Sequence, residues 1–146
     1  MNRRHFAALA GALFAAPLMA AATKKSSSSA KRTRERVVLQ TSDSEPKRWN
    51  LVLTTAKTLQ KEYGDEKIVV EIVAFGPGVN MLKTDSEVAN RVANALGRGI
   101  LVTACAASLK AHNIDEEDLV KYVTTVTSGV VHIVQRQRSG WLYLKP

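Results

Sequence analysis

The sequence predicts an α/β fold, a single compact three-layer domain with a mostly parallel sheet of about five strands and helices on both faces. Short apolar runs rich in β-branched residues alternate along residues 37–146 with segments of helical periodicity. Two of these runs, KIVVEIVAF (67–75) and ILVTA (100–104), are nearly continuous in apolar residues, as strands covered on both faces require. Helical connections between successive strands favour right-handed crossovers and parallel pairing.

The first predicted strand is VVLQTS (37–42), whose polar end opens into a loop. A helix is expected next, with Ser44 as its cap, Pro46 in its first turn and Gly64 at its end. Its apolar face recurs at steps of three and four residues and consists of Trp49, Val52, Leu53, Ala56, Leu59 and Tyr63. The second strand, at 67–75, is the strongest strand signal in the chain.

The segment GPG (76–78) breaks the second strand and predicts a loop that continues to Lys83. Thr84 and Glu87 have the spacing of a capping box, so the next helix is expected to begin there. The apolar face of that helix consists of Val88, Ala89, Val92, Ala93 and Leu96, with Gly97 and Gly99 at its end. The third strand, 100–104, then places Cys105 at the carboxyl edge of the sheet.

The last part of the chain gives weaker signals. A short helix is expected near Ser108 to His112, and a further turn near Asp115 to Lys121. YVTTVT (122–127) is a weaker strand candidate, and WLYLK (141–145) is a final strand. The segment SGVVHIVQRQ (128–137) fits either a strand or a helix, and we interpret it as a helix capped by Ser128.

Residues 1–22 have the organisation of an export signal. A basic segment is followed by an apolar run (7–19) and by small residues at 20–22. The apolar run is too short to span a bilayer comfortably, so no stable membrane span is expected after cleavage. RRHFA (3–7) also fits a twin-arginine signal, with an ordinary basic segment as the alternative. We therefore expect a periplasmic protein exported by the Sec or the twin-arginine route.

The basic charge of the chain is concentrated in its first 36 residues. This part carries eight Lys and Arg against one acid, whereas residues 37–146 carry thirteen basic and twelve acidic side chains. The serine-rich, basic segment 23–36 predicts a flexible linker, with contact to anionic lipid as a less favoured alternative. Because the domain at 37–146 is nearly neutral and has no basic stripe interleaved with aromatics, no nucleic-acid partner is expected.

Cys105 is the only cysteine, so no internal disulfide is possible. Free cysteine is often buried as a small hydrophobe, which gives one interpretation. The other follows from position, because a thiol between a strand end and a helix start lies near backbone N–H groups that favour the thiolate. His112, seven residues further on, is a weaker catalytic candidate as a base, against a surface histidine at a helix end.

Ligands of parallel α/β sheets bind beyond the carboxyl ends of the strands. The candidates at that edge, in addition to Cys105, are Ser42, Asp43, Gly76, Gly78 and Asn80. A glycine loop can bind phosphate, but Pro77 removes one N–H donor and neither the dinucleotide nor the P-loop spacing is present, so a plain turn is favoured. No cofactor is expected, and the histidines and Cys105 lack the spacing of a zinc site.

Two further polar residues interrupt apolar patterns. Glu71 lies in the second strand, and an unpaired buried carboxylate is costly, so it needs either an oligomer contact or an exposed edge. His132 falls in the apolar helix pattern and is interpreted as a satisfied or snorkelling residue and not as a ligand.

The stretch CAASLKAHNIDEEDL (105–119) resembles the region around the sulfur-accepting cysteine of DsrE- and TusD-type sulfur-relay subunits. VEIVAFGPGVNML (70–82), SGVVHIVQRQ and GWLYLKP (140–146) are also similar to the DsrE/DsrF-like family, so the resemblance covers nearly all of residues 36–146. It implies an oligomer-forming α/β domain in which Cys105 matches the cysteine that carries sulfur as a persulfide.

The resemblance leads to a functional expectation with an alternative. We expect an exported, homo-oligomeric sulfur carrier, at most sulfurtransferase-like, with sulfur-donor and sulfur-acceptor proteins as partners. The alternative is a non-catalytic oligomeric or small-ligand-binding module in which Cys105 is structural. Nucleotide binding at the glycine turn is a third, weaker hypothesis.

Overall fold

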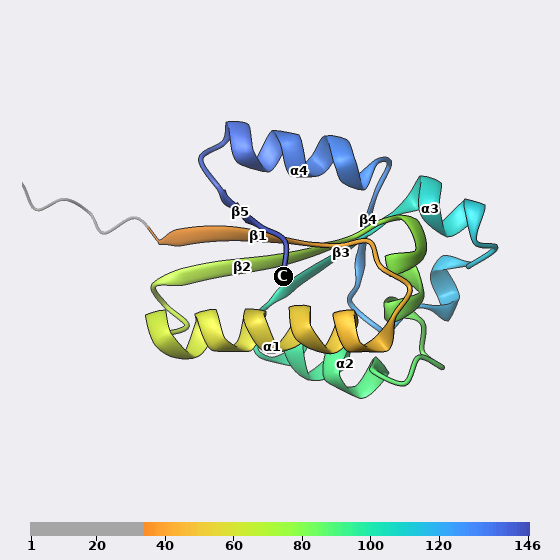
Figure 1. Ribbon diagram of the computed structural model, residues 1–146, viewed down its shortest axis with the longest axis horizontal. Helices are drawn as coiled ribbons and strands as arrows, with labels where there is room; N and C mark the ends of the chain where they lie inside the picture. The colour runs from red at the N-terminus through yellow and green to blue at the C-terminus, as the bar shows by residue number, and fades with distance from the viewer. Residues whose placement is uncertain (1–33) are drawn as a thin grey trace, which may run out of the picture.

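The computed structural model describes residues 34–146, and the predictions for residues 1–22 and for most of the linker lie outside this range. One five-stranded sheet carries helices on both faces, which confirms the predicted fold class (Figure 1). In chain order the elements are β1 (Glu35–Thr41), α1 (Pro46–Tyr63), β2 (Ile68–Ala74), η1 (Gly76–Leu82), α2 (Ala89–Gly97), β3 (Leu101–Cys105), α3 (Ala106–Ala111), η2 (Glu116–Asp118), β4 (Thr124–Val126), α4 (Gly129–Arg138) and β5 (Leu142–Leu144).

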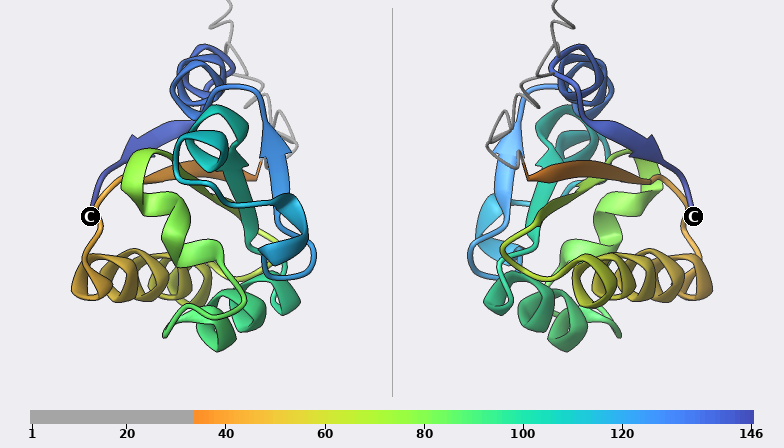
Figure 2. Two further views of the ribbon diagram at one scale, coloured as in Figure 1. Left: turned by 90° about the vertical axis from the view of Figure 1, so that its right-hand side faces the viewer. Right: turned by 90° about the vertical axis from the view of Figure 1, so that its left-hand side faces the viewer.

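The strand order is β4-β3-β2-β1-β5, and every pairing in this sheet is parallel. The chain steps from β1 to β4 in one direction, and α4 then returns it to β5 on the far side of β1. Since right-handed crossovers in opposite directions use opposite faces, α1 and α2 cover one face and α4 the other (Figure 2). The chain therefore leaves β3 and β4 toward different faces, which makes their carboxyl ends the topological switch point of the sheet.

The two faces of the sheet have cores of different size. Apolar side chains from β1, β2 and β3 pack with α1, α2, η1 and α3 into one continuous cluster. On the α4 face the buried apolar cluster contains only Val38, Val73, Ile133 and Trp141. The Arg136 guanidinium stacks over the Trp141 ring with 4.6 Å between its carbon and the ring centroid. Helix α4 is thus attached with little aliphatic packing.

Both predicted caps in the first half of the domain are wrong. Helix α1 begins at Pro46 with Glu45 as its N-cap residue, and neither Ser44 nor Glu45 caps it by a side chain. A proline in the first turn leaves one N–H fewer to satisfy, which reduces the need for a cap. Thr84 hydrogen-bonds the Asp118 carbonyl through its hydroxyl at 3.0 Å, so a tertiary contact replaces the capping box and α2 starts only at Ala89.

Other boundaries shift by one turn or less. Strand β1 begins at Glu35, two residues before the predicted start, and the expected loop after β2 is the 3₁₀ helix η1. Helix α3 begins directly after Cys105, two residues earlier than predicted. The helix interpretation of residues 128–137 is confirmed by α4. The predicted cap is also confirmed, because Ser128 Oγ accepts a hydrogen bond from Val131 N–H at 3.4 Å. Among the described residues, no helix has the length and apolar character needed to cross a membrane.

Candidate functional site

Cys105 is the last residue of β3 and the N-cap residue of α3. Its side chain is 5% exposed, and its sulfur lies 4.0 Å from the Thr127 carbonyl oxygen. The first residue of α4 packs directly against it, because a Cβ added to Gly129 would lie 3.2 Å from Cys105 Cβ and 3.1 Å from Phe75 Cβ. A side chain at residue 129 would therefore require Cys105 or Phe75 to shift, whereas glycine fits without adjustment.

Burial of Cys105 raises the pKa of its thiol, but hydrogen bonds from the Ser108 hydroxyl and from the backbone of Gly129, Ser108 and Ala107 outweigh it, so the pKa is lowered. These backbone groups belong to the first turns of α3 and α4, where N–H groups have no partner within their own helix. Ser108 Oγ accepts the Gly76 N–H at 2.8 Å, which leaves its own proton free for the sulfur. The thiol is therefore mostly buried and still placed to ionise.

Three of the predicted edge residues meet at the carboxyl ends of β1 and β2. Gly76 has a positive φ of 52°, and a Cβ added there would lie 3.9 Å from the Ser42 carbonyl oxygen. A Cβ added to Gly78 would lie 2.5 Å from the Thr41 carbonyl oxygen, so η1 packs against β1 only because this residue is glycine. Through its bond to Ser108, Gly76 connects this edge to the Cys105 environment.

The remaining predicted residues are not part of this arrangement. Asp43 accepts the Trp49 indole N–H at 2.7 Å with its backbone carbonyl, and the Asn80 amide donates to a carbonyl of its own loop at 3.0 Å. His112 is exposed and follows the end of α3, whereas Cys105 precedes its start. Seven residues of helical rise separate the two by roughly 10 Å.

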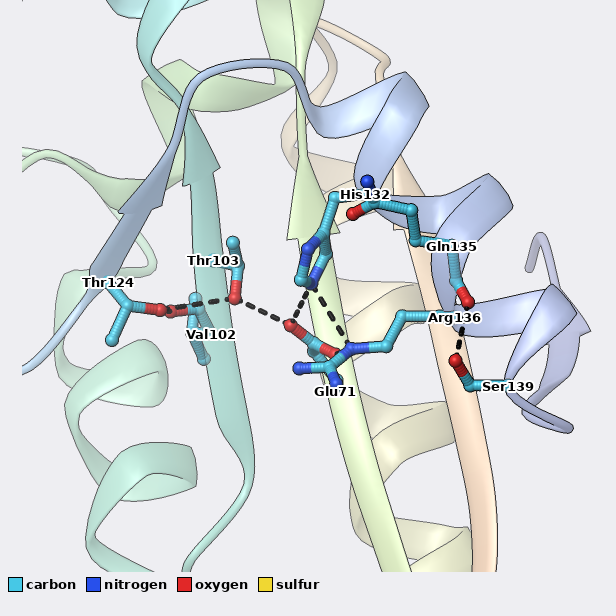
Figure 3. A network of polar contacts seen from close by, with 8 residues as sticks. All are labelled: Glu71, Val102, Thr103, Thr124, His132, Gln135, Arg136 and Ser139. Atoms are coloured by element: carbon cyan, nitrogen blue, oxygen red, sulfur yellow. Dashed lines mark hydrogen bonds and ion pairs between the residues drawn. The ribbon is translucent and has the colours of Figure 1, made fainter.

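A buried polar network on β2 was missed by the sequence reasoning (Figure 3). Glu71 is 1% exposed, and its Oε1 accepts from Thr103 Oγ1 at 2.8 Å and lies 2.7 Å from His132 Nε2. Its Oε2 accepts from Arg136 Nε at 2.6 Å. Both predicted environments for Glu71, an exposed edge and an oligomer contact, are wrong, because its partners come from α4 and β3 of the same chain. His132 and Arg136 lie four residues apart, which places both on one helix face.

Burial raises the pKa of the Glu71 carboxyl. Hydrogen bonds from Arg136, Thr103 and His132 lower it by more than burial raises it, so the pKa lies below its ordinary value. The geometry also assigns the His132 tautomer. Arg136 Nε contacts both Glu71 Oε2, at 2.6 Å, and His132 Nε2, at 3.2 Å. An ionised carboxylate can only accept, so the 2.7 Å contact with Oε1 puts a proton on Nε2, and the shorter contact takes the Arg136 proton. Within residues 34–146 the other ring nitrogen, Nδ1, has no hydrogen-bond partner.

A cavity of about 490 Å³ lies between β4 and α4, beside both Cys105 and the Glu71 network. Cys105 and Glu71 do not line it, but Thr127, whose carbonyl is near the Cys105 sulfur, and His132, which contacts Glu71, do. Thr125, Ser128, Val131 and Gln135 also line it. A second cavity, of about 540 Å³ near α1 and α2, is lined by none of the predicted site residues. In residues 34–146, no cluster of three or more His, Cys, Asp or Glu residues could hold a metal ion.

The DsrE/DsrF-like family model matches residues 36–146 of the chain, which is most of its length. The chain belongs to the DsrE/DsrF-like family. No curated protein matches the sequence. Among solved structures, the protein of unknown function MTH1491 from Methanobacterium thermoautotrophicum is 37% identical with a TM-score of 0.73, and the match covers 77% of this chain and 99% of that one.

Two more distant structures share the DsrE/DsrF-like fold. The protein of unknown function BT1422 from Bacteroides thetaiotaomicron is 16% identical with a TM-score of 0.63, covering 77% of this chain and 95% of that one. The ychN protein from E. coli is 13% identical with a TM-score of 0.64, covering 78% of this chain and 100% of that one. At these identities the likeness is one of fold, and the function of this chain has to be argued from its own residues.

Proposed function

We propose that this DsrE/DsrF-like domain is a sulfur carrier that holds sulfane sulfur as a persulfide on Cys105. The observation that carries the proposal is the convergence of the Ser108 hydroxyl and the first turns of α3 and α4 on one thiol, whose pKa is lowered. The family membership of residues 36–146 is consistent with such a role.

In this reaction the Cys105 thiolate attacks the outer sulfur of a donor. A bond forms between Sγ and that sulfur, the donor's own S–S bond breaks, and the electron pair leaves with the remainder of the donor. No external oxidant or reductant is needed, because the sulfane sulfur brings its own oxidation state. An acceptor thiol then attacks the terminal sulfur and regenerates Cys105, so the chain is at most sulfurtransferase-like.

The proposal is tested by incubating the purified protein with thiosulfate and measuring its intact mass. Wild type is expected to gain the mass of one sulfur atom, which a reductant removes, and Cys105→Ser is expected to gain none. If wild type stays at its original mass, or if the serine variant gains sulfur equally, the carrier function is rejected.

A second candidate function is a non-catalytic oligomeric or small-ligand-binding module in which Cys105 only packs. Two observations favour it: the 5% exposure of Cys105, and the exposed apolar side chains on α4 and β5, namely Val130, Val131, Val134, Leu142, Tyr143 and Leu144. Exposed apolar side chains at this end of the sheet suit a homo-oligomer contact. This candidate predicts that iodoacetamide alkylates the folded protein no faster than the unfolded chain, and that sedimentation detects an oligomer.

We further propose that the protein is exported to the periplasm, on the basis of the residue pattern at 1–22. Fractionation of cells that express the full chain tests this, and retention in the cytoplasm would contradict it. Replacing both Arg3 and Arg4 by lysine distinguishes the two routes, because a twin-arginine signal requires the arginine pair and a Sec signal needs only positive charge.

A further inference from the structure

The cavity between β4 and α4 lies at the topological switch point of the sheet, where parallel α/β folds bind their ligands. We propose that this cavity binds a small anionic sulfane-sulfur donor of the thiosulfate type, and that His132 contacts the donor through Nδ1 and protonates its leaving group. This inference rests on the proposed carrier function and adds the substrate class and a second catalytic residue.

The lining of the cavity favours an anion. It offers the hydroxyls of Thr125, Thr127 and Ser128, the Gln135 amide and the His132 ring, and none of its lining residues is acidic. Ser128 also marks the N-terminus of α4, whose partial positive charge favours a bound anion. The one carboxylate behind this wall is already neutralised by a 2.6 Å ion pair with Arg136.

His132 is held by one nitrogen and open at the other. Its Nε2–H is committed to Glu71 Oε1 at 2.7 Å, which fixes the ring, and Figure 3 shows the second nitrogen directed away from that carboxylate. The charged groups against the ring are Glu71 from β2 and Arg136 from α4. The uncharged Thr103 from β3 bonds the same Glu71 oxygen. A carboxylate-held imidazole with one free nitrogen is the usual arrangement of a general acid or base.

Cys105 does not itself line the cavity, and two neighbouring residues connect it to the cavity wall. The Cys105 sulfur lies 4.0 Å from the carbonyl oxygen of Thr127, which lines the cavity. Gly129 packs on Cys105, and His132 follows it three residues later in α4, about 4.5 Å along the helix axis.

The proposed step balances without a further reactant. The Cys105 thiolate bonds to the sulfane sulfur of thiosulfate, the S–S bond of thiosulfate breaks, and its electron pair leaves on sulfite. In the proposed step His132 enters with a proton on each ring nitrogen, and its Nδ1 proton passes to sulfite, giving hydrogensulfite. The neutral ring that remains still donates its Nε2–H to Glu71, and Cys105 holds a persulfide anion.

The test measures the rate of sulfur uptake by intact mass against thiosulfate concentration. Val131→Trp fills the cavity and is expected to raise the half-saturating concentration by about tenfold or more, because it removes binding. Val130→Trp is the matched control, since its side chain is equally exposed at 54% against 53% and does not line this cavity. It is expected to load like wild type.

His132→Gln keeps an N–H donor for Glu71 but lacks a second nitrogen that could donate a proton to the leaving group. We expect a maximal loading rate at least about tenfold lower, as loss of a general acid implies, with alkylation by uncharged iodoacetamide unchanged. Uptake of sulfur by wild type together with wild-type kinetics in both His132→Gln and Val131→Trp would overturn the inference and leave the carrier function standing. Failure of wild type to take up sulfur would reject the carrier function itself.

An equal loss of iodoacetamide reactivity in Val131→Trp would also overturn the inference, because the indole would then merely cover the thiol. Val131 is half exposed, so this arm does not depend on a buried substitution. If His132→Gln fails to fold, as judged by circular dichroism, the Val131 and Val130 pair still decides whether the cavity binds the donor.

Discussion

The two faces of the sheet are covered by different means. The α1 and α2 face is packed by a continuous apolar cluster, whereas the α4 face has four buried apolar residues and, beside them, the Glu71 network and Cys105. Fully burying a large aliphatic side chain stabilises a fold by about 1.5–3 kcal/mol, so most of the hydrophobic stabilisation comes from the first face. Cys105, His132 and the Glu71 network belong to the second face, and Ser108 of α3 reaches the same thiol from the first.

This difference suggests what the buried ion pair does. A buried pair is weak evidence for net stability, because desolvation offsets much of its attraction, but it disfavours every arrangement in which one partner is left alone. Arg136 and His132 both meet Glu71, so α4 is fixed in rotation and in position along its axis. That position in turn places Gly129 on Cys105.

Removing the Glu71 carboxylate is expected to have the largest effect on this face. Glu71→Ala leaves Arg136 and His132 without their acceptor and is expected to lower the free energy of unfolding by about 3 kcal/mol, the low end for breaking a buried pair because the Arg136 side chain is 33% exposed. Urea denaturation followed by tryptophan fluorescence measures it, since Trp49 and Trp141 report on opposite faces.

Two controls sharpen this measurement. Glu62→Ala, at an exposed position of α1, is expected to stay within about 0.5 kcal/mol of wild type. In a Trp49→Phe background only Trp141 reports, and in a Trp141→Phe background only Trp49 reports. When Glu71→Ala is added to each background, the Trp141 transition is expected at a lower urea concentration than the Trp49 transition. Coincident transitions would mean that the two faces unfold as one unit, so that the difference in their packing does not make one face less stable than the other.

Acid should remove the same contribution from wild type. The folded-state pKa of Glu71 is lowered below its ordinary value of 4.5, so its stabilisation is complete above that value and is lost as the pH falls through the folded-state pKa. The difference in unfolding free energy between wild type and Glu71→Gln is therefore expected to be constant near neutral pH and to shrink below pH 4.5. A difference that grows in acid would contradict the assignment of an ionised Glu71.

Glycine positions allow a direct comparison of the two faces. Gly129→Ala pushes a methyl group to 3.1 Å from Phe75 and 3.2 Å from Cys105, and overpacking of this kind costs about 1–3 kcal/mol. Gly97→Ala, in α2 on the other face, meets nothing within 4 Å and is expected to be neutral or to stabilise by about 0.5–1 kcal/mol. Thermal unfolding measures both, and equal effects would show that α4 adjusts freely.

The fold could be predicted from the sequence because the periodicity of apolar residues can be recognised without knowing any tertiary contact. The apolar runs of β2 and β3 and the helical spacing of α1 identified a covered parallel sheet. The caps failed where a distant partner decided the outcome. Thr84 bonds the Asp118 carbonyl 34 residues away, and no local pattern encodes that contact.

The candidate site was predictable only in part. The position of Cys105 between a strand and a helix follows from local pattern, whereas the approach of Gly129 depends on how α4 docks. The Glu71 network was missed although its signal was present. The signal was a glutamate in an apolar strand, together with a His and an Arg four residues apart on one later helix. Burying the glutamate requires polar partners, and these two side chains can supply them.

The smallest predicted effect separates the reactivity of Cys105 from the stability of its face. Ser108→Ala removes a hydrogen bond to the Cys105 sulfur, so we expect the pKa of the thiol to rise and alkylation at neutral pH to slow. It also removes the acceptor of the Gly76 N–H, at a cost of only about 1 kcal/mol. The pH dependence of iodoacetamide alkylation measures the first effect, and urea denaturation measures the second.

Ser139→Ala, which deletes a similar hydroxyl at the opposite end of α4, should leave alkylation unchanged. If Ser108→Ala reacts as fast as wild type, the α3 and α4 backbone alone sets the thiolate population, and the hydroxyl serves only to hold η1 against α3.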